Sequence, residues 1–306
     1  MVKVAFIFPG QGAQFVGMGQ EFYDASPAAK EIFEKANRII PGLTEVILNG
    51  PQEKLTLTAY CQPGIFTVSV AALKAFQQSP QYKNFSLQFV AGLSLGEYCA
   101  LAASESLSFE ETLKLVERRS FFMEEATRLK KGAMAAIIGF DKDQLARICR
   151  ETGAEIANFN TPEQIVITGE ADKVAKALAA IKEKGAKRVI PLEVSGAFHS
   201  SLMQPAAANF IKELNKIKFQ TAKIPIVSNV DAKPVTDPEK IRVNLGLQIT
   251  SSVQWVDSIQ YMASQGVEHF IEIGPGNVLK GLIRKINPAL KVANISTPHD
   301  IDKLFV

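Results

Sequence analysis

Hydrophobic residues along this chain fall into short continuous runs, separated by longer segments with a helical repeat. The runs that predict buried strands are Val4–Phe8, Leu87–Ala91, Lys223–Asn229, Glu268–Ile273 and Lys291–Ile295. Strands that read as continuous apolar runs, with helical patterns between most of them, are typical of a parallel sheet covered on both faces. The pattern therefore predicts an α/β fold with a mostly parallel sheet.

Two helix starts are marked by capping residues. Ser26 precedes Pro27, so a hydroxyl can accept from the first turn while proline occupies the first helical position. Ser108 followed by Glu111 has the spacing of a capping box. Helices are therefore predicted to begin after Ser26 and after Ser108.

One segment, 132–195, departs from this order. Its patterns read strand, helix, strand, strand, helix, strand, over Ala133–Gly139, Lys142–Thr152, Glu155–Phe159, Gln164–Thr168, Ala171–Lys184 and Lys187–Leu192. This is the order of a split βαβ, ferredoxin-like unit. We expect a small subdomain over 132–195, inserted into a large domain of 1–131 and 196–306, with the active site in the cleft between them.

Composition excludes several classes of protein. Of the 306 residues, 47% are hydrophobic and 21% are charged, which is ordinary globular usage and excludes a disordered or fibrous chain. The 34 Lys and Arg residues against 31 Asp and Glu give a net charge of +3. That balance argues against a nucleic-acid binder that relies on a basic surface.

Targeting signals and metal-ligand spacings are missing from the sequence. The first apolar run is too short for a signal peptide, and the uncharged stretch between Lys54 and Lys74 is a poor membrane helix because it contains Pro63, Gly64 and several threonines. The three cysteines, Cys61, Cys99 and Cys149, have no CxxC spacing, which fits a reducing compartment. We expect a cytoplasmic protein without membrane contact and without a metal site.

A glycine-rich loop, Pro9–Gly19, follows the first strand. It fails the dinucleotide fingerprint at Phe15 and the P-loop pattern at Met18. Two interpretations remain, a plain strand-to-helix turn or a tight loop whose backbone N–H groups stabilise an anionic oxygen.

The segment Gly92-Leu93-Ser94-Leu95-Gly96 has the G-x-S-x-G pattern between a predicted strand and a helical pattern. That context is typical of a nucleophile elbow, in which small neighbours let a strained turn present the serine Oγ. The pattern favours Ser94 as a nucleophile over a structural serine.

A serine nucleophile needs a base, and the chain has three histidines. His269 lies within a predicted strand and is expected to be structural, while His299 lies in a terminal loop. His199 follows the end of the 132–195 segment, on the cleft side of the large domain, so its location favours it as the base.

Arg119 completes an apolar stripe on the helix that follows Ser108. The apolar members of the stripe are Leu115, Phe122, Ala126 and Leu129. Arg118 falls on the charged face and is expected to be solvated. Because a buried guanidinium needs an anion, Arg119 forms either an internal ion pair or a clamp for a substrate carboxylate.

These residues belong to a set of motifs that resembles a known family. In chain order the motifs are FPGQGAQ from Phe8, GLSLGEY around Ser94, Arg119 followed by Met123, NFNTPEQIVITG from Asn158, SGAFHS around His199, Gln248 ahead of Val253-Gln254-Trp255, and EIGPG from Glu272. Over essentially all 306 residues the chain is similar to the acyltransferase family of fatty acid and polyketide synthesis, and within it to malonyl-CoA:acyl carrier protein transacylases. The resemblance implies an α/β-hydrolase-like large domain with a ferredoxin-like insert.

The resemblance also implies roles for single residues. Ser94 is the nucleophile and His199 its base, oriented by the backbone carbonyl of Gln248 in place of an acidic residue. The N–H groups of Gln11 and Leu95 form the oxyanion hole. Arg119 holds the malonyl carboxylate, so the resemblance favours the substrate-carboxylate clamp over the internal ion pair as the role of this residue.

Three further substrate-binding positions follow from the resemblance. Met123 accompanies Arg119, Asn160 lines the entrance on the small-subdomain side, and Phe198 resembles the malonyl-selecting pattern. The chain departs from the family at Leu93, where most members have histidine.

The implied activity is malonyl transfer from malonyl-CoA to the phosphopantetheine thiol of acyl carrier protein, an acidic and transient partner, through an acyl-Ser94 intermediate in fatty acid synthesis. No cofactor is implied, and we expect a monomer. The alternatives are a thioesterase or carboxylesterase whose base is His269 or His299, a carrier-protein-binding scaffold that has lost its chemistry, and a trans-acting polyketide acyltransferase.

Overall fold

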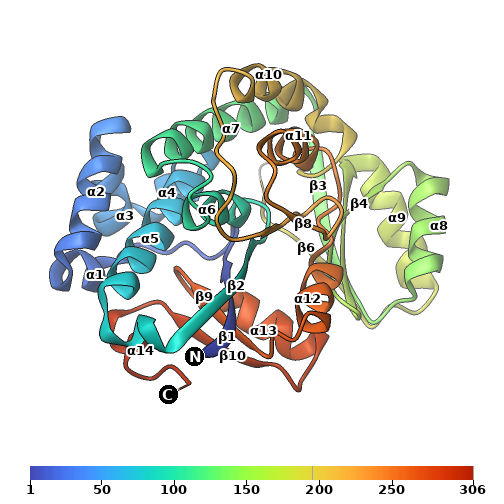
Figure 1. Ribbon diagram of the computed structural model, residues 1–306. Helices are drawn as coiled ribbons and strands as arrows, with labels where there is room; N and C mark the ends of the chain where they lie inside the picture. Colours follow the sequence, from blue (N-terminus) through green and yellow to red (C-terminus); the bar gives the residue numbers. More distant parts are fainter. Residues whose placement is uncertain (195, 306) are drawn as a thin grey trace.

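The larger part of the molecule is built on a six-stranded sheet (Figure 1), in a computed structural model that describes residues 1–194 and 196–305. Its strands are β1 (Val2–Phe8), β2 (Phe85–Gly92), β7 (Ile226–Val227), β8 (Pro234–Val235), β9 (His269–Ile273) and β10 (Lys291–Ile295). They lie in the order β10-β9-β1-β2-β7-β8, and every neighbouring pair is parallel except β7 and β8. The prediction of a mostly parallel sheet is confirmed.

One predicted strand is much shorter than expected. The run Lys223–Asn229 contributes only the two residues of β7. Pro225 has no N–H to extend the ladder, although its carbonyl accepts from Val90 N at 3.0 Å. Beyond β7 the chain turns, and Asn229 leaves the sheet.

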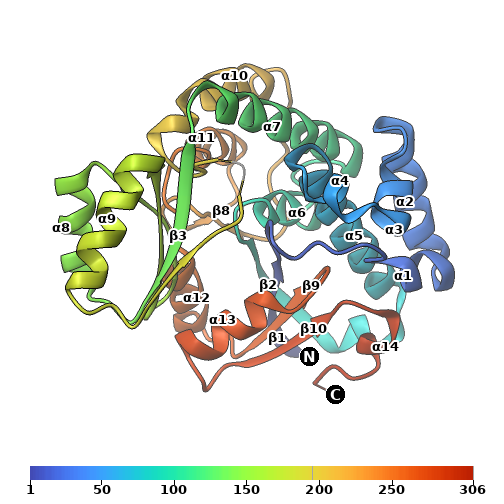
Figure 2. The ribbon, with the colours of Figure 1, turned by 180° about the vertical axis from the view of Figure 1, so that it is seen from behind.

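Helices cover both faces of this sheet (Figure 2). The helices of this part of the molecule are α1 (Gln20–Ala25), α2 (Pro27–Ile39), α3 (Leu43–Asn49), α4 (Gln52–Thr56), α5 (Thr58–Gln78), η1 (Pro80–Asn84), α6 (Gly96–Ala103), α7 (Phe109–Leu129), η2 (Ser201–Met203), α10 (Gln204–Leu214), α11 (Pro238–Gln248), α12 (Trp255–Ser264), α13 (Val278–Ile286) and α14 (Pro298–Ile301). Along β1, Phe6 packs with the core shared by α2, α5 and α7, while Ile7 packs with that of α12 and α13. Successive side chains therefore fill opposite cores.

The two predicted helix starts are correct. The Ser26 hydroxyl accepts from Ala29 N at the start of α2, and Ser108 and Glu111 form a complete capping box at the start of α7. The long uncharged stretch forms most of α5, which is buried against α2 and α7. In residues 1–194 and 196–305, no helix combines the length and apolarity that a membrane crossing requires.

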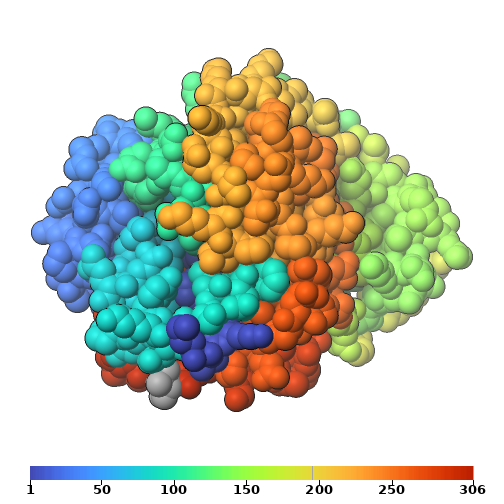
Figure 3. Space-filling view, viewed as in Figure 1, coloured from blue at the N-terminus to red at the C-terminus, as the bar shows by residue number. Residues whose placement is uncertain are grey.

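A second, antiparallel sheet forms a lobe beside the first, visible in yellow-green in Figure 3. Its elements are β3 (Gly132–Ile138), α8 (Lys142–Thr152), β4 (Glu155–Thr161), β5 (Gln164–Glu170), α9 (Ala171–Glu183) and β6 (Arg188–Pro191), with strand order β4-β5-β3-β6. The predicted succession of elements is observed. The predicted boundary at Ser195 lies outside the described residues.

The antiparallel sheet is joined to the larger part of the molecule by backbone hydrogen bonds at Val253. Its N–H donates to Ala157 O at 2.8 Å, and its carbonyl accepts from Phe159 N at 2.9 Å. These bonds attach β4 to the segment that runs from the end of α11 to α12, which also reaches the site described next.

Candidate active site

Two predicted functional residues, Gln11 and Ser94, meet an unpredicted one, Asn229, where the parallel strands end. Gln11 follows β1, Ser94 follows β2 and Asn229 follows β7, so three loops converge at the carboxyl edge of the large sheet. This edge is where open α/β sheets bind their ligands.

The turn that carries Ser94 is tight and strained. Ser94 has φ 53°, a left-handed conformation that is costly for a residue with a side chain. A Cβ on Gly92 would come within 2.0 Å of the backbone of Gly96, and a Cβ on Gly96 within 2.1 Å of Phe8 O. Only glycine fits at these two positions, as a nucleophile elbow requires.

Asn229 braces this turn from the neighbouring loop. Its Oδ1 accepts from Ser94 N at 2.7 Å, and its Nδ2 donates to Gly92 O at 2.7 Å. One side chain thus satisfies backbone groups on both sides of the strained residue, which offsets part of the cost of its conformation.

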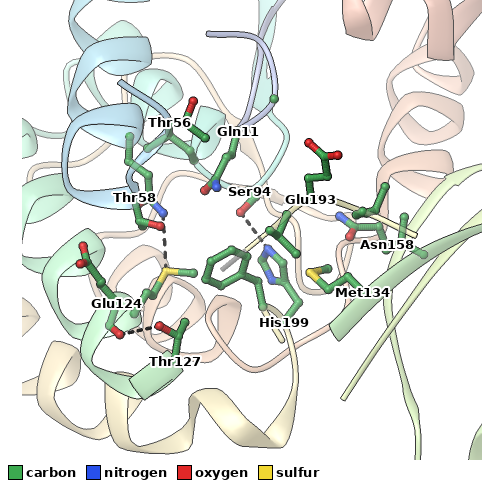
Figure 4. Close-up of a pocket in the computed structure, with 18 of the residues that line it drawn as sticks. Gln11, Thr56, Thr58, Ser94, Glu124, Thr127, Met134, Asn158, Glu193 and His199 are labelled. Atoms are coloured by element: carbon green, nitrogen blue, oxygen red, sulfur yellow. Dashed lines mark hydrogen bonds between the residues drawn. The ribbon is translucent and has the colours of Figure 1, made fainter. Parts of the chain in front are cut away.

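Ser94 and His199 face each other across the floor of a cavity (Figure 4). Ser94 Oγ lies 2.8 Å from His199 Nε2. On the other side of the ring, Nδ1 lies 2.9 Å from Gln248 O and 3.1 Å from Ser251 O. Because both partners are carbonyls, Nδ1 carries the hydrogen and Nε2 has a free lone pair for the serine proton.

Burial lowers the pKa of His199 to about 4, and the positive charge of Arg119 acts in the same direction. The imidazole is therefore neutral near pH 7. A neutral imidazole aimed at a serine hydroxyl is the arrangement needed for general-base catalysis.

Arg119 is fully buried, with its guanidinium beside the serine. Nη2 donates to Ser94 Oγ and to Gln248 Oε1, both at 3.1 Å, and Nη1 donates to Gln62 Oε1 at 2.6 Å. No carboxylate of the described residues lies within 4.0 Å of it, and Nε has no partner among them. The internal ion pair, one of the two alternatives for this residue, is therefore not observed.

The apolar stripe on α7, from which the burial of Arg119 was predicted, is only partly buried. Arg118 is exposed, as expected, and Ala126 is buried, but Leu129 is 73% exposed. Leu129 is the last residue of α7, where the helix leaves the core before reaching β3.

Glu97 is a second buried charge that the sequence analysis did not single out. It lies in the first turn of α6 and is 2% exposed. Its Oε2 accepts from Gln248 Nε2 at 2.6 Å, and both its oxygens lie 3.4 Å from Asn229 N. Burial raises the pKa of Glu97 to about 7, although these hydrogen bonds, one from Ser228 and the charge of Arg119 lower it.

A cavity of about 540 Å³ opens above these residues. Its lining comes both from the part of the molecule built on the six-stranded sheet and from the lobe built on the antiparallel sheet. Figure 4 shows Thr56 and Thr58 on one side and Met134 and Asn158 on the other. The predicted positions that line it, besides Ser94 and His199, are Gln11, Leu95, Arg119, Met123, Asn160 and Phe198. Gln248 lies behind the serine.

Several lining groups have unused hydrogen-bonding capacity. Within 1–194 and 196–305, the backbone N–H groups of Gln11 and Leu95 have no acceptor, and Asn160 Oδ1 has no donor. Free donors near a serine can stabilise an oxyanion, and a free amide oxygen can accept from a substrate N–H.

The other histidines contact neither Ser94 nor each other. His269 lies in β9 against the ring of Phe305, and His299 is exposed in α14, where a loop was expected. In the part of the chain that the structure describes, no group of three or more His, Cys, Asp or Glu side chains could hold a metal ion.

Comparison with known proteins identifies the family. Residues 5–297 match the acyl transferase domain model. The chain belongs to the acyl transferase family. A relative from Bacillus subtilis named malonyl CoA-acyl carrier protein transacylase is 44% identical over 99% of this chain and 96% of its own length. One from Staphylococcus aureus with the same name is 42% identical over 98% of both chains.

Solved structures of similar acyl transferases agree with this assignment. An acyl-carrier-protein S-malonyltransferase from Bartonella henselae superposes with a TM-score of 0.94 at 38% identity, over 99% of this chain and 98% of its own. A malonyl transacylase solved in complex with its type II polyketide acyl carrier protein has a TM-score of 0.94 at 36% identity, over 98% of both chains.

Three polar residues of this acyl transferase site were not predicted: Gln62, Glu97 and Asn229. A signal existed for Glu97, because it is the one charged residue in the otherwise uncharged run Gly96–Ala103. Gln62 and Asn229 carry no such signal, since their roles depend on contacts with residues 57 and 135 positions away.

Proposed function

We propose that this protein transfers a malonyl group from malonyl-CoA to the phosphopantetheine thiol of acyl carrier protein. The observation that carries the proposal is Arg119, a buried guanidinium without a carboxylate partner that contacts the hydroxyl of a serine paired with histidine. Such a cation is costly to bury unless an anion joins it. A substrate carboxylate in the cavity supplies that anion, and malonyl carries one whereas acetyl does not.

The first half-reaction acylates Ser94. His199 Nε2 takes the hydroxyl proton as Oγ attacks the thioester carbonyl, and the N–H groups of Gln11 and Leu95 stabilise the oxyanion. Collapse of the tetrahedral intermediate breaks the C–S bond. The imidazolium gives its proton to the departing thiolate, so coenzyme A leaves as its thiol.

The second half-reaction runs in the opposite sense. The phosphopantetheine thiol of the carrier protein gives its proton to His199 and attacks the malonyl ester, and Ser94 leaves as its hydroxyl. Carbonyls of Gln248 and Ser251 hold the ring throughout, so no acidic residue is needed to fix its tautomer. Each step exchanges one acyl bond for another, and we propose that no cofactor takes part.

The remaining predicted positions shape substrate entry. We assign Met123 and Phe198 to the apolar wall around the acyl group and Asn160 to the entrance, where its free Oδ1 can accept from an amide N–H. Arg119 aligns the malonyl group for attack through its carboxylate.

The cavity fits a division of the chain into two units. We propose a large, α/β-hydrolase-like domain of 1–131 and 196–306 and a ferredoxin-like subdomain of 132–195, which the strand order β4-β5-β3-β6 supports. Residues from both units line the cavity.

The proposed partner and pathway rest on the relatives. One similar malonyl transacylase was solved with its acyl carrier protein, and the Bacillus subtilis relative is named for the same carrier. We propose a monomeric enzyme of fatty acid synthesis that binds the carrier transiently. A polyketide role remains the second candidate, because the carrier in that complex serves polyketide synthesis.

Intact-protein mass spectrometry tests the proposal. Mixing the protein with malonyl-CoA should add one malonyl group, and Ser94→Ala should abolish the adduct. Added holo-acyl carrier protein should remove the adduct and gain malonyl itself. Absence of an adduct on the wild-type protein, or an adduct on Ser94→Ala, would refute the mechanism. Release of malonate rather than malonyl-carrier would indicate a hydrolase instead.

A further inference from the structure

The side-chain amide of Gln248 connects the two buried charges of the site. Its Oε1 accepts from Arg119 Nη2 at 3.1 Å, while its Nε2 donates to Glu97 Oε2 at 2.6 Å and to Ser94 O at 2.9 Å. The amide oxygen therefore faces the cation and the amide nitrogen faces the anion. Gln248 bridges two charged groups that do not themselves form an ion pair.

The opposite orientation of this amide is excluded by its neighbours. A flipped Gln248 would point Nε2 hydrogens at the Arg119 guanidinium, which has donors only. It would also point Oε1 at the carboxylate of Glu97 and at the carbonyl of Ser94, which are acceptors. The ionised carboxylate of Glu97 can only accept hydrogen bonds, so it fixes which end of the Gln248 amide faces it.

Glu97 is itself held in place by three donors, which come from two segments of the chain. These are Gln248 of α11, Asn229 N and the Ser228 hydroxyl, the last two in the turn after β7. The charged and titratable groups that act on it are Arg119 of α7 and Tyr98, its neighbour in α6. Among the described residues, the polar groups that contact the carboxylate are thus donors.

We propose that Glu97 is a positioning residue for substrate selection, which acts through the amide of Gln248 to hold Arg119 where a substrate carboxylate can reach it. This inference rests on the malonyl transfer proposed above. Glu97 contacts no substrate, since it is buried below the cavity and is not among its lining residues. Arg119 Nη2 is the group that both meets Ser94 Oγ and depends on the bridge.

The ionisation of Glu97 adds a second, independent signature. Its pKa is raised to about 7, so the carboxylate gains its acceptor-only character as the pH rises through neutrality. His199, with a pKa of about 4, and Arg119, which stays protonated, keep their states in that range. Preference for a carboxylate-bearing acyl group should therefore rise with pH through about 7.

The experiment compares Glu97→Gln with wild type by the initial rates at which malonyl-CoA and acetyl-CoA acylate Ser94, read by intact mass. Glutamine keeps the shape but replaces one of the two acceptor oxygens with an NH2 group, so its two ends cannot accept both from Gln248 and from the donors of the turn after β7. We expect the malonyl-to-acetyl rate ratio to fall roughly tenfold or more, as for loss of a hydrogen bond to a charged group. Glu117→Gln, in α7 but not among the residues that line the cavity, is the control and should keep the ratio.

A double-mutant cycle tests the route through Gln248. Gln248→Met removes the bridge, so adding Glu97→Gln to it should lower the ratio no further. The acetyl rate reports the amount of folded enzyme, because misfolding lowers both rates equally. In wild type the ratio should rise between about pH 6 and pH 8, and in Glu97→Gln it should stay flat.

Three results would overturn the inference: an unchanged ratio in Glu97→Gln, additive losses in the double variant, or an identical pH dependence in wild type and Glu97→Gln. These outcomes presuppose that wild type forms the malonyl adduct. If it forms none, the proposed function fails instead, so the two failures are distinguishable.

Discussion

The buried carboxylate of Glu97 should leave a measurable mark on the stability of the protein. In the folded chain its pKa is raised from an ordinary value of 4.5 to about 7, chiefly by burial. The folded state therefore binds the proton more tightly than the unfolded state. The stabilisation is fully present below about pH 4.5 and is lost as the pH rises through about 7. At about 1.4 kcal/mol per pKa unit, the full effect is about 3 kcal/mol.

His199 has the opposite linkage, so wild type alone would conceal this effect. Its pKa falls from 6.5 to about 4, and its contribution to stability is present above about pH 6.5 and lost as the pH falls through about 4. The two effects are similar in size and overlap in pH. The useful quantity is therefore the difference in unfolding free energy between wild type and Glu97→Gln, from which the His199 contribution cancels.

The assay is equilibrium unfolding in urea from about pH 5 to pH 8, followed by the fluorescence of Trp255, the only tryptophan and fully buried. The stability of wild type relative to Glu97→Gln should fall by about 2 kcal/mol over this range. Hydrogen bonds lost in the variant change this difference in unfolding free energy by the same amount at every pH, so they do not alter its dependence on pH. Glu272→Gln provides a positive control, because burial also raises the pKa of Glu272. A flat or rising difference for Glu97→Gln would refute the reasoning.

Three other substitutions have defined outcomes. Arg119→Ala should lower the rate of Ser94 acylation by malonyl-CoA at least tenfold while changing acetyl-CoA far less, measured by intact mass; equal losses would contradict the carboxylate clamp. Asn229→Ala should reduce both acylation rates and the melting temperature, because it leaves Ser94 N and Gly92 O without their partner. An unchanged melting temperature would show that water replaces the side chain. Gly96→Ala should destabilise the protein by about 3 kcal/mol or more in urea, since its Cβ would meet Phe8 O at 2.1 Å; Gly281→Ala, with open space around it in α13, is the control and should not destabilise.

Much of the fold was predictable because local rules decide it. The β1 run, the Ser108 capping box and the strand–turn–helix around Ser94 are all read from residues that are close in sequence, and each is observed. The exception is β7, where Pro225 interrupts an apolar run that otherwise reads as a full strand.

The site was only partly predictable, because its polar contacts span the whole chain. Ser94 and His199 could be singled out by motif and by location, and Arg119 by its place in an apolar stripe. The bridge from Glu97 to Arg119 could not, because it depends on Gln248, which is 151 positions from one and 129 from the other. Sequence periodicity contains no information on which buried donors meet which acceptors.

The bonds at Val253 have a mechanical consequence. Within a few residues of chain, two carbonyls hold the histidine ring and Val253 pairs with the backbone of β4. We expect a movement of β4 to be transmitted through this segment to the carbonyls of Gln248 and Ser251. The position of β4, which lines the cavity through Asn158 and Asn160, is therefore coupled to the orientation of the His199 ring through the short backbone segment 248–253.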